Sequence, residues 1–262
     1  MWIARTGIVK ALLLAALIVS SCAGSLPITA ASETGRFSSG PGDGTLVVIG
    51  VSGRMRREER EIDSALDDAA RQIALYQGLK GKATTVLETG GGYRNFYLAI
   101  KTKVKPLYES DYAAYRAALR YDREKDLVRT GNAVFIRCAY DMPGLSSLGY
   151  NDETVNGKPA WLRGPITIPG YSSAVGFAKK HRRLAETIAR SRESAAIALM
   201  AGLSSHIETI VADHANRRAA VTTRETIEGE LINFMILETW IDPETGSVWT
   251  LAAAKKNQEE TP

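Results

Sequence analysis

Apolar and polar residues follow one another along the first half of the chain in patterns typical of strands and helices. A β-branched run at residues 45–52 predicts a buried strand. Apolar residues then recur at three- and four-residue steps from Ile62 to Tyr76, which predicts one face of a helix that ends at Gly78. Alternation at residues 95–104 predicts a second strand with one apolar face.

Shorter elements complete the first half. Ser110 or Asp111 is a suitable N-cap for a short helix, and residues 131–140 predict a further strand. The inner face of that helix is expected to carry Tyr112, Tyr115, Ala118 and Leu119. Residues 143–165 form a segment rich in Pro, Gly, Asn and Asp, which favours a connecting loop between two halves.

The second half begins with a strand pattern at residues 166–178 and a long helix pattern whose apolar positions run from Leu184 to Ile210. A hairpin follows, in which residues 230–241 and 247–252 flank Asp-Pro-Glu-Thr-Gly. Proline presets φ and glycine accepts a positive φ in such a turn. The hairpin places Trp240 and Trp249 on opposite strands, where core packing is favoured over a ligand platform. Trp161 lies near the end of the preceding loop.

Short sequence matches accompany the repeated order of elements. Residues 49–51 match 175–177, and residues 73–79 match 197–203, with a small insertion between the two matches. We interpret the chain as an α+β protein of two related strand–long helix–antiparallel hairpin units, with the helices packed on antiparallel sheet. The predicted organisation is a signal peptide (1–21), a flexible tether (22–44), a first unit (45–142), a connecting loop (143–165), a second unit (166–256) and a disordered tail (257–262).

The N-terminus predicts a compartment. Arg5 and Lys10 precede an apolar run at residues 11–19, and small residues follow, as in a secretory signal peptide. The run has about half of the ~20 residues that cross a bilayer. A cysteine at the cleavage point, Cys22, resembles the signal of bacterial lipoproteins, which implies acylation of Cys22 and a membrane-anchored mature chain. The alternative is an ordinary signal cleaved further on, for example after Ala31.

The residue after the cysteine, Ala23, is not Asp. By the sorting rule of the lipoprotein family this implies the outer membrane of a bacterial cell envelope, facing the periplasm. The full chain has a formal net charge of +4, of which Arg5 and Lys10 supply two, so the mature chain carries about +2. That charge does not predict a nucleic-acid partner.

The second half also resembles a family of envelope proteins that includes the twenty-kilodalton bacterial surface lipoproteins and the N-terminal domain of flagellar assembly protein T. The residues that carry the resemblance lie between about 165 and 256: Ala174 to Ala178, the helix alanines Ala185, Ala189, Ala195, Ala196 and Ala198, and Trp240, Ile241, Asp242, Thr245, Gly246, Leu251 and Ala252. The resemblance implies an α/β domain used for envelope assembly or protein contacts, with no general catalytic residues.

Candidate chemistry is sparse. Cys138 lies in a strand pattern and is expected to be buried and inert. The histidines His181, His206 and His214 are expected on exposed helix surface and do not have the spacing of a metal site. The carboxylates of Glu58, Glu59, Glu61, Asp67 and Asp68 lie beside arginines on a predicted helix, where a solvated face is expected rather than a catalytic pair.

The sequence therefore predicts a non-enzymatic envelope lipoprotein with no catalytic, metal or cofactor site, held at the membrane by Cys22 and bound to an envelope protein. Two alternatives remain open at this point. One is a small-ligand carrier or enzyme whose site is assembled from distant residues. The other is a peripheral membrane-modulating protein, whose second long helix would lie on anionic lipid through residues 179–183.

Overall fold

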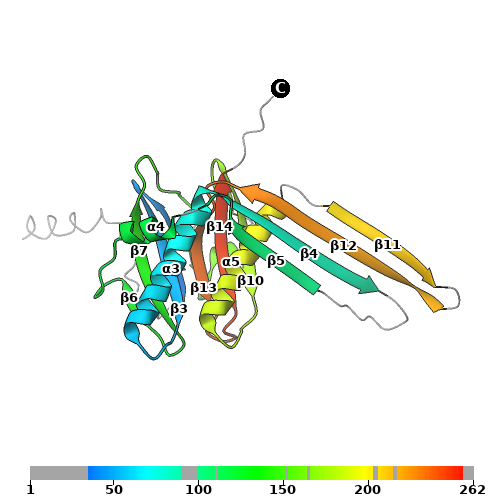
Figure 1. Ribbon diagram of the computed structural model, residues 1–262, viewed down its shortest axis with the longest axis horizontal. Coiled ribbons are helices and arrows are strands. Elements are labelled where there is room, and N and C mark those ends of the chain that lie inside the picture. Colours follow the sequence, from blue (N-terminus) through cyan, green and yellow to red (C-terminus); the bar gives the residue numbers. More distant parts are fainter. Residues whose placement is uncertain are drawn as a thin grey trace, which may run out of the picture.

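The computed structural model describes residues 35–89, 99–109, 111–150, 153–163, 166–202, 206–214 and 217–255. For residues 85–89, 99–101, 206–214 and 217–225 the description covers the backbone alone. Within these ranges the fold is a mixed one, with three α-helices packed against several antiparallel sheets (Figure 1). The predicted signal peptide with Cys22, the start of the predicted strand at 95–104 and the tail at 257–262 lie outside the described residues.

One sheet, which we call sheet B, is covered by the first long helix. Its strands lie in the order β2-β3-β7-β6, and β3 pairs antiparallel with β7 along its whole length. The helix is α3 (Glu58–Gln77), and the strands are β2 (Gly40–Gly42), β3 (Thr45–Gly53), β6 (Leu127–Arg129) and β7 (Ala133–Asp141).

A second sheet, sheet A, is covered by the second long helix. Its strands lie in the order β1-β13-β14-β10, all paired antiparallel. The helix is α5 (Leu184–Ala201), and the strands are β1 (Arg36–Ser38), β10 (Tyr171–Ala178), β13 (Met235–Ile241) and β14 (Val248–Lys255). Asn233, with φ of 54°, lies between β12 and β13, so the predicted strand at 230–241 is interrupted there.

The third sheet, sheet C, takes two strands from each half of the chain and reaches beyond the helices in Figure 1. Its strands lie in the order β11-β12-β4-β5 and are β4 (Leu79–Thr89), β5 (Ala99–Pro106), β11 (His206–His214) and β12 (Arg217–Leu231). The paired glycines Gly81 and Gly229 face α5, and a side chain at Gly81 would clash with Met200. Sheet C therefore passes close under the end of α5.

Smaller elements connect these layers. They are α4 (Tyr112–Ala118), β8 (Thr154–Val155), β9 (Lys158–Pro159) and the 3₁₀ turn η1 (Ala160–Leu162). The predicted cap is confirmed, because the Asp111 carboxylate accepts a hydrogen bond from the Ala114 amide at 2.9 Å. On the predicted inner face, Leu119 is buried and Tyr115 half-buried, whereas Tyr112 and Ala118 are exposed.

The segment that leads into the body joins sheets A and B. Strand β1 pairs with β13 and strand β2 with β3, with Ser39 between them donating its amide to the Leu237 carbonyl at 2.9 Å. Gly40 has a φ of +106° and lies against the Leu237 side chain, so this bend favours glycine. Residues 36–38 and 40–42 are thus strands that link two sheets, and the prediction of a flexible tether through residue 44 is wrong for them.

Positions 126 residues apart have matching geometry. Helix α3 begins at Glu58 and α5 at Leu184, and the residues preceding them, Arg57 and Arg183, have φ,ψ of −114°,126° and −113°,125°. The turn glycines Gly44 and Gly170 precede β3 and β10 with φ of +70° and +76°. All the buried residues of α5 have buried counterparts in α3: Thr187 with Glu61, Ile188 with Ile62, Ser191 with Ala65, Ala195 with Ala69, Ala196 with Ala70, Leu199 with Ile73 and Met200 with Ala74.

Two glycines fix the distance between strand and helix in the same way. A side chain at Gly50 would clash with the Ala65 carbonyl, and one at Gly176 would clash with the Ser191 carbonyl. The offset of 126 holds from strand to helix, so the predicted small insertion is wrong. An insertion would align the fully buried Ile73 with the half-buried Ile197, whereas the offset of 126 aligns it with the buried Leu199.

Both long helices begin at the same end of the molecule. Strands β3 and β10 run in the same direction, because β1 and β2 belong to one continuous segment and the pairings on either side are antiparallel. Each strand leads into its helix, so α3 and α5 are parallel, with their starts at the bottom of Figure 1. Helix α5 ends at Ala201, and the prediction that it continues to Ile210 is wrong, because residues 206–214 form β11.

Candidate functional site

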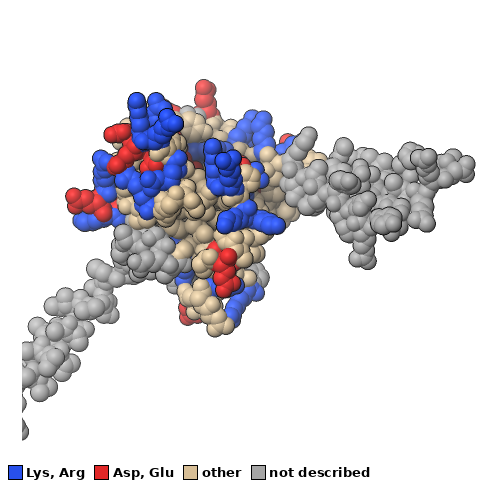
Figure 2. Space-filling view, turned by 90° about the horizontal axis from the view of Figure 1, so that it is seen from below, with Lys and Arg blue, Asp and Glu red and all other residues tan. Residues whose placement is uncertain are grey.

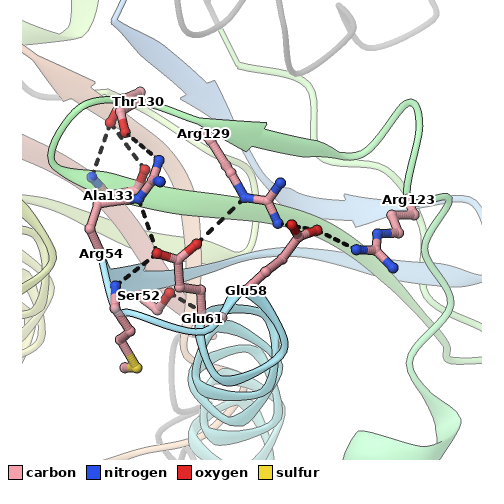
Figure 3. A network of polar contacts seen from close by, with 9 residues as sticks. Ser52, Arg54, Glu58, Glu61, Arg123, Arg129, Thr130 and Ala133 are labelled. Carbon is pink, nitrogen blue, oxygen red and sulfur yellow. Dashed lines mark hydrogen bonds and ion pairs between the residues drawn. The ribbon is translucent and has the colours of Figure 1, made fainter.

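The start of α3 carries a network of arginines and carboxylates (Figure 3). The Glu61 side chain is only 2% exposed, and its carboxylate accepts from Arg54 Nε at 3.0 Å and from the Met55 amide at 2.7 Å. Arg129 Nε lies 3.5 Å from the same carboxylate. The prediction of a solvated Glu61 is therefore wrong, and the helix buries this charge with its partners because an unpaired buried carboxylate would be costly.

The neighbouring Glu58 extends the network outward. Its carboxylate pairs with Arg129 Nη2 at 2.5 Å and with Arg123. Hydrogen bonds from Arg129 and Arg123 hold the pKa of Glu58 below its usual value. Both arginines thus stabilise the ionised form of Glu58. The network therefore binds the loop between β3 and α3 to the first turn of the helix.

The start of α5 has the same backbone arrangement with a neutral side chain. The Thr187 hydroxyl accepts from the His181 amide at 3.0 Å, at positions equivalent to Glu61 and Met55. His181 is exposed, and its Nδ1 lies 2.8 Å from Glu186. In both loops the fourth residue of the helix thus holds the same loop amide, which indicates a structural role for Glu61.

A second polar cluster links the two helices. Asp68 on α3 accepts from the Val51 amide at 2.9 Å and from Arg192 Nη1 at 2.8 Å, while Arg192 Nη2 donates to the Ile49 carbonyl at 2.8 Å. Gln72 Nε2 also donates to the Ile49 carbonyl at 2.8 Å. These side chains satisfy backbone groups of β3, so the expectation of a solvated face is wrong for Asp68 as well. Asp67, by contrast, is exposed and pairs with Arg116.

The cleft between the helices is small. It holds about 50 Å³ and is bordered by Arg71, Arg192 and Glu193. Burial raises the pKa of Glu193. Pockets for small organic ligands enclose roughly 300–1,000 Å³, so this cleft has room for little more than water.

An open groove lies on sheet C. It encloses about 380 Å³, is open to solvent, and is lined by Lys80, Gly81, Lys82, Lys103, Lys105, Glu228, Gly229 and Glu230. The register sets Lys105, Lys80 and Glu230 in one row across the sheet. Lys103, Lys82 and Glu228 form the next row, in which Lys82 Nζ pairs with Glu228 at 2.7 Å. The groove is thus a charged surface, unlike the largely apolar pockets typical of small-molecule sites.

Cys138 on β7 is fully buried, and burial raises the pKa of its thiol to about 12. The prediction of a buried cysteine is therefore confirmed, and at neutral pH the thiol stays protonated and weakly nucleophilic. The proposed lipid-attachment residue, Cys22, lies outside the described residues.

The histidines are not where the sequence predicted them. His206 and His214 lie at the two ends of β11, a strand rather than a helix, and His181 lies in the loop before α5. Across the described ranges, no three His, Cys, Asp or Glu side chains form a group that could hold a metal ion. None of the helices described is long and apolar enough to cross a membrane.

Two tryptophans of the described residues belong to the core. Trp161 and Trp240 are each 2% exposed and pack in the cluster beneath α3. Trp240 and Trp249 are directly paired across β13 and β14, as the hairpin pattern predicted. The half-buried Trp249 ring contacts Phe177, with ring centroids 4.4 Å apart, at the outer edge of sheet A.

A scan of protein-family models found no match, and neither did searches of curated proteins and of solved structures.

Sequence reasoning missed the Glu61 network, the Asp68–Arg192 link and the lysine rows of sheet C. For the lysine rows a strand signal was visible, because Lys80 and Lys82 alternate with the small or apolar residues Leu79, Gly81 and Ala83. The first two had no such signal, because their partners lie far apart in the chain.

Proposed function

We propose that this protein is a non-enzymatic lipoprotein of the bacterial cell envelope, anchored by acylated Cys22, whose body binds an envelope protein. The body is proposed to consist of two duplicated strand–helix–hairpin units. The equivalent positions at Gly44 and Gly170, at Gly50 and Gly176, and at the two helix starts support this duplication.

The attachment of the N-terminal segment to the body supports an anchoring role. Arg36 on β1 forms two hydrogen bonds with the fully buried Glu238 carboxylate, at 2.6 Å and 2.9 Å. A bidentate pair of this kind is stronger than a neutral hydrogen bond. The chain that leads from Cys22 is thus held to the centre of sheet A and, through β2, to sheet B.

The observation that carries the protein-binding role is sheet C. Strands β4 and β12, one from each half, pair at its centre, and the sheet extends past the helices (Figure 1). Its groove presents Lys80, Lys103 and Lys105 beside Glu230. An open surface with both charges suits a protein surface with complementary charges, since such complementarity fixes specificity and orientation.

Two measurements test the proposal. Mass spectrometry of the mature N-terminus is expected to show acylated Cys22, and Cys22→Ala is expected to prevent that acylation. A photo-reactive amino acid at Lys103 is expected to give a discrete cross-link in cells, whereas the same group at Glu124, an exposed residue outside sheet C, is expected to give none. An unmodified N-terminus beyond Cys22, or equal cross-linking from both positions, would contradict the proposal.

A further inference from the structure

The end of the molecule where both long helices begin carries an unusual density of basic side chains. We call this the basic end and define it by six exposed residues in the two equivalent loops: Arg56 and Arg57 before α3, and Lys179, Lys180, Arg182 and Arg183 before α5. Figure 2, which views the molecule from below, shows Lys and Arg prevailing over Asp and Glu on this face.

These six side chains are not used by the fold. In the described part of the chain none of them forms an ion pair or a side-chain hydrogen bond, in contrast to Arg54, Arg123 and Arg129, which hold Glu58 and Glu61. The exposed carboxylates nearby are Glu59 and Glu244, together with Glu58, which pairs with Arg123 and Arg129, and Glu186, which pairs with His181 and Arg190. The six basic groups therefore outnumber the exposed acidic ones.

The backbone adds to the positive potential at this end. Helices α3 and α5 are parallel and both point their N-termini toward it. A helix N-terminus carries the equivalent of roughly half a positive charge. The loops also place Met55, which is 44% exposed, among the arginines, so an apolar side chain is available at the same surface.

The chain that leads to Cys22 emerges at this same end. The carbonyl of Gly35, the first described residue, accepts from the Ile241 amide at 2.8 Å. Ile241 pairs with Val248, and Val248 pairs with Ala178, which directly precedes Lys179. Three strand spacings separate Gly35 from the basic loop, a distance of about 15 Å.

The length of the intervening chain fits the same arrangement. Residues 23–34 separate Cys22 from Gly35, and a stretch of this length spans at most about 45 Å. With Cys22 inserted in a bilayer, the basic end is therefore the part of the described body held nearest to the attachment point. The base of sheet C lies at the other end of α3, about 30 Å away for a helix of 20 residues.

We propose that the basic end is a docking surface for an anionic lipid bilayer. Basic side chains near such a surface are attracted to its charged headgroups, and stable membrane binding generally combines a lipid anchor with a second signal of this kind. Docking at this end points the N-termini of the two parallel helices toward the membrane and holds sheet C away from it. The placement of this end at a membrane rests on the proposed anchor at Cys22, but lipid binding by the basic end is testable without acylation.

The test is flotation of the full chain carrying Cys22→Ala. The vesicles contain phosphatidylcholine either alone or with about 30 mol% phosphatidylglycerol, at low and at high salt. The protein is expected to float with the anionic vesicles at low salt, to be released at high salt, and to remain unbound with the neutral ones. Absence of flotation with anionic vesicles, or equal flotation with both, overturns the proposal.

Two quadruple variants, each removing four positive charges, locate the surface. In the first, Arg56, Arg57, Arg182 and Arg183 become Gln, and binding to the anionic vesicles is expected to weaken at least about tenfold. In the matched control, Lys80, Lys82, Lys103 and Lys105 become Gln. At about 0.1 M salt the Debye length is about 10 Å and that groove lies roughly 30 Å away, so binding is expected to change less than about threefold.

Thermal unfolding measured by circular dichroism checks that both quadruple variants keep their fold. An equal loss of vesicle binding in the two variants would show that net charge alone governs it, and would overturn the proposal. Failure of this test leaves the mass spectrum of Cys22 unaffected, so it is distinguishable from failure of the proposed lipoprotein function.

Discussion

The starts of α3 and α5 use different side chains in the same backbone arrangement. At α3 the Met55 amide donates to the buried carboxylate of Glu61, whereas at α5 the His181 amide donates to the hydroxyl of Thr187. Glu61 is accompanied by Arg54 and Arg129, but Thr187 is neutral and requires no counter-ion. Both loops therefore require a side-chain acceptor for this amide. Only the acceptor at α3 is charged, so only that loop needs arginine partners.

The consequence appears on the surface. Around α3 the arginines at Arg54, Arg123 and Arg129 are bound by Glu58 and Glu61. Around α5, where Glu58 and Glu61 are replaced by Leu184 and Thr187, the basic loop is left exposed. The start of α3 therefore combines a closed charge network with the exposed Arg56 and Arg57, whereas the basic residues before α5 are all exposed.

The largest expected effect concerns the glycines that lie against the two long helices. Gly50→Ala and Gly176→Ala are each expected to lower the free energy of unfolding by about 3 kcal/mol, because the new Cβ would overlap the backbone of the packed helix. Chemical denaturation measures the effect. Gly53→Ala is the control, since its Cβ would meet no atom within 4 Å, and an equal loss there would contradict the explanation.

A smaller loss of unfolding free energy is expected from variants at the two helix starts, where the amide acceptors differ. Glu61→Ala is expected to cost about 2 kcal/mol of unfolding free energy, because it leaves the Met55 amide and Arg54 without their acceptor. Thr187→Val removes two neutral hydrogen bonds, one from the His181 amide and one to the Arg183 carbonyl, and is expected to cost about 1 kcal/mol. Denaturant titration of both variants ranks them. A larger cost for Thr187→Val would reverse the comparison.

The smallest expected effect concerns the ion pair between α3 and α5. Asp68 and Arg192 are 27% and 11% exposed, so solvent weakens their attraction, and a double-mutant cycle with Asp68→Asn and Arg192→Leu is expected to give a coupling energy of about 0.5–1 kcal/mol. Leucine is the residue at the equivalent position of α3, Leu66. A coupling near zero would show that the Asp68–Arg192 pair itself does not stabilise the fold.

Local patterns predicted much of the fold. The strand at 45–52, the α3 face from Ile62 to Tyr76 and the turn before Trp249 were all visible as periodicity or turn chemistry. The end of α5 was not, because residues 206–214 have apolar positions that fit a helix as well as a strand. Their long pairing with β12 decides the strand.

The charged residues show the same limit. Glu61 and Asp68 lie among arginines on a helix, which from sequence favours a solvated face. Their burial depends on the Met55 and Val51 amides, which only the folded loop and strand bring to them. Sequence likewise gave no sign that Arg56 and Arg182 lie at one end of the molecule.

By itself, the sequence determined the elements that local periodicity and turn residues encode, and it carries the signal on which the Cys22 anchor is proposed. Only the tertiary structure decided the offset of 126, the joining of sheets A and B through Gly40, and the gathering of two basic loops beside Gly35. The physical reason is that side-chain spacing specifies which face of an element is apolar. Which elements lie side by side follows from strand pairing between residues as far apart as Arg36 and Trp240.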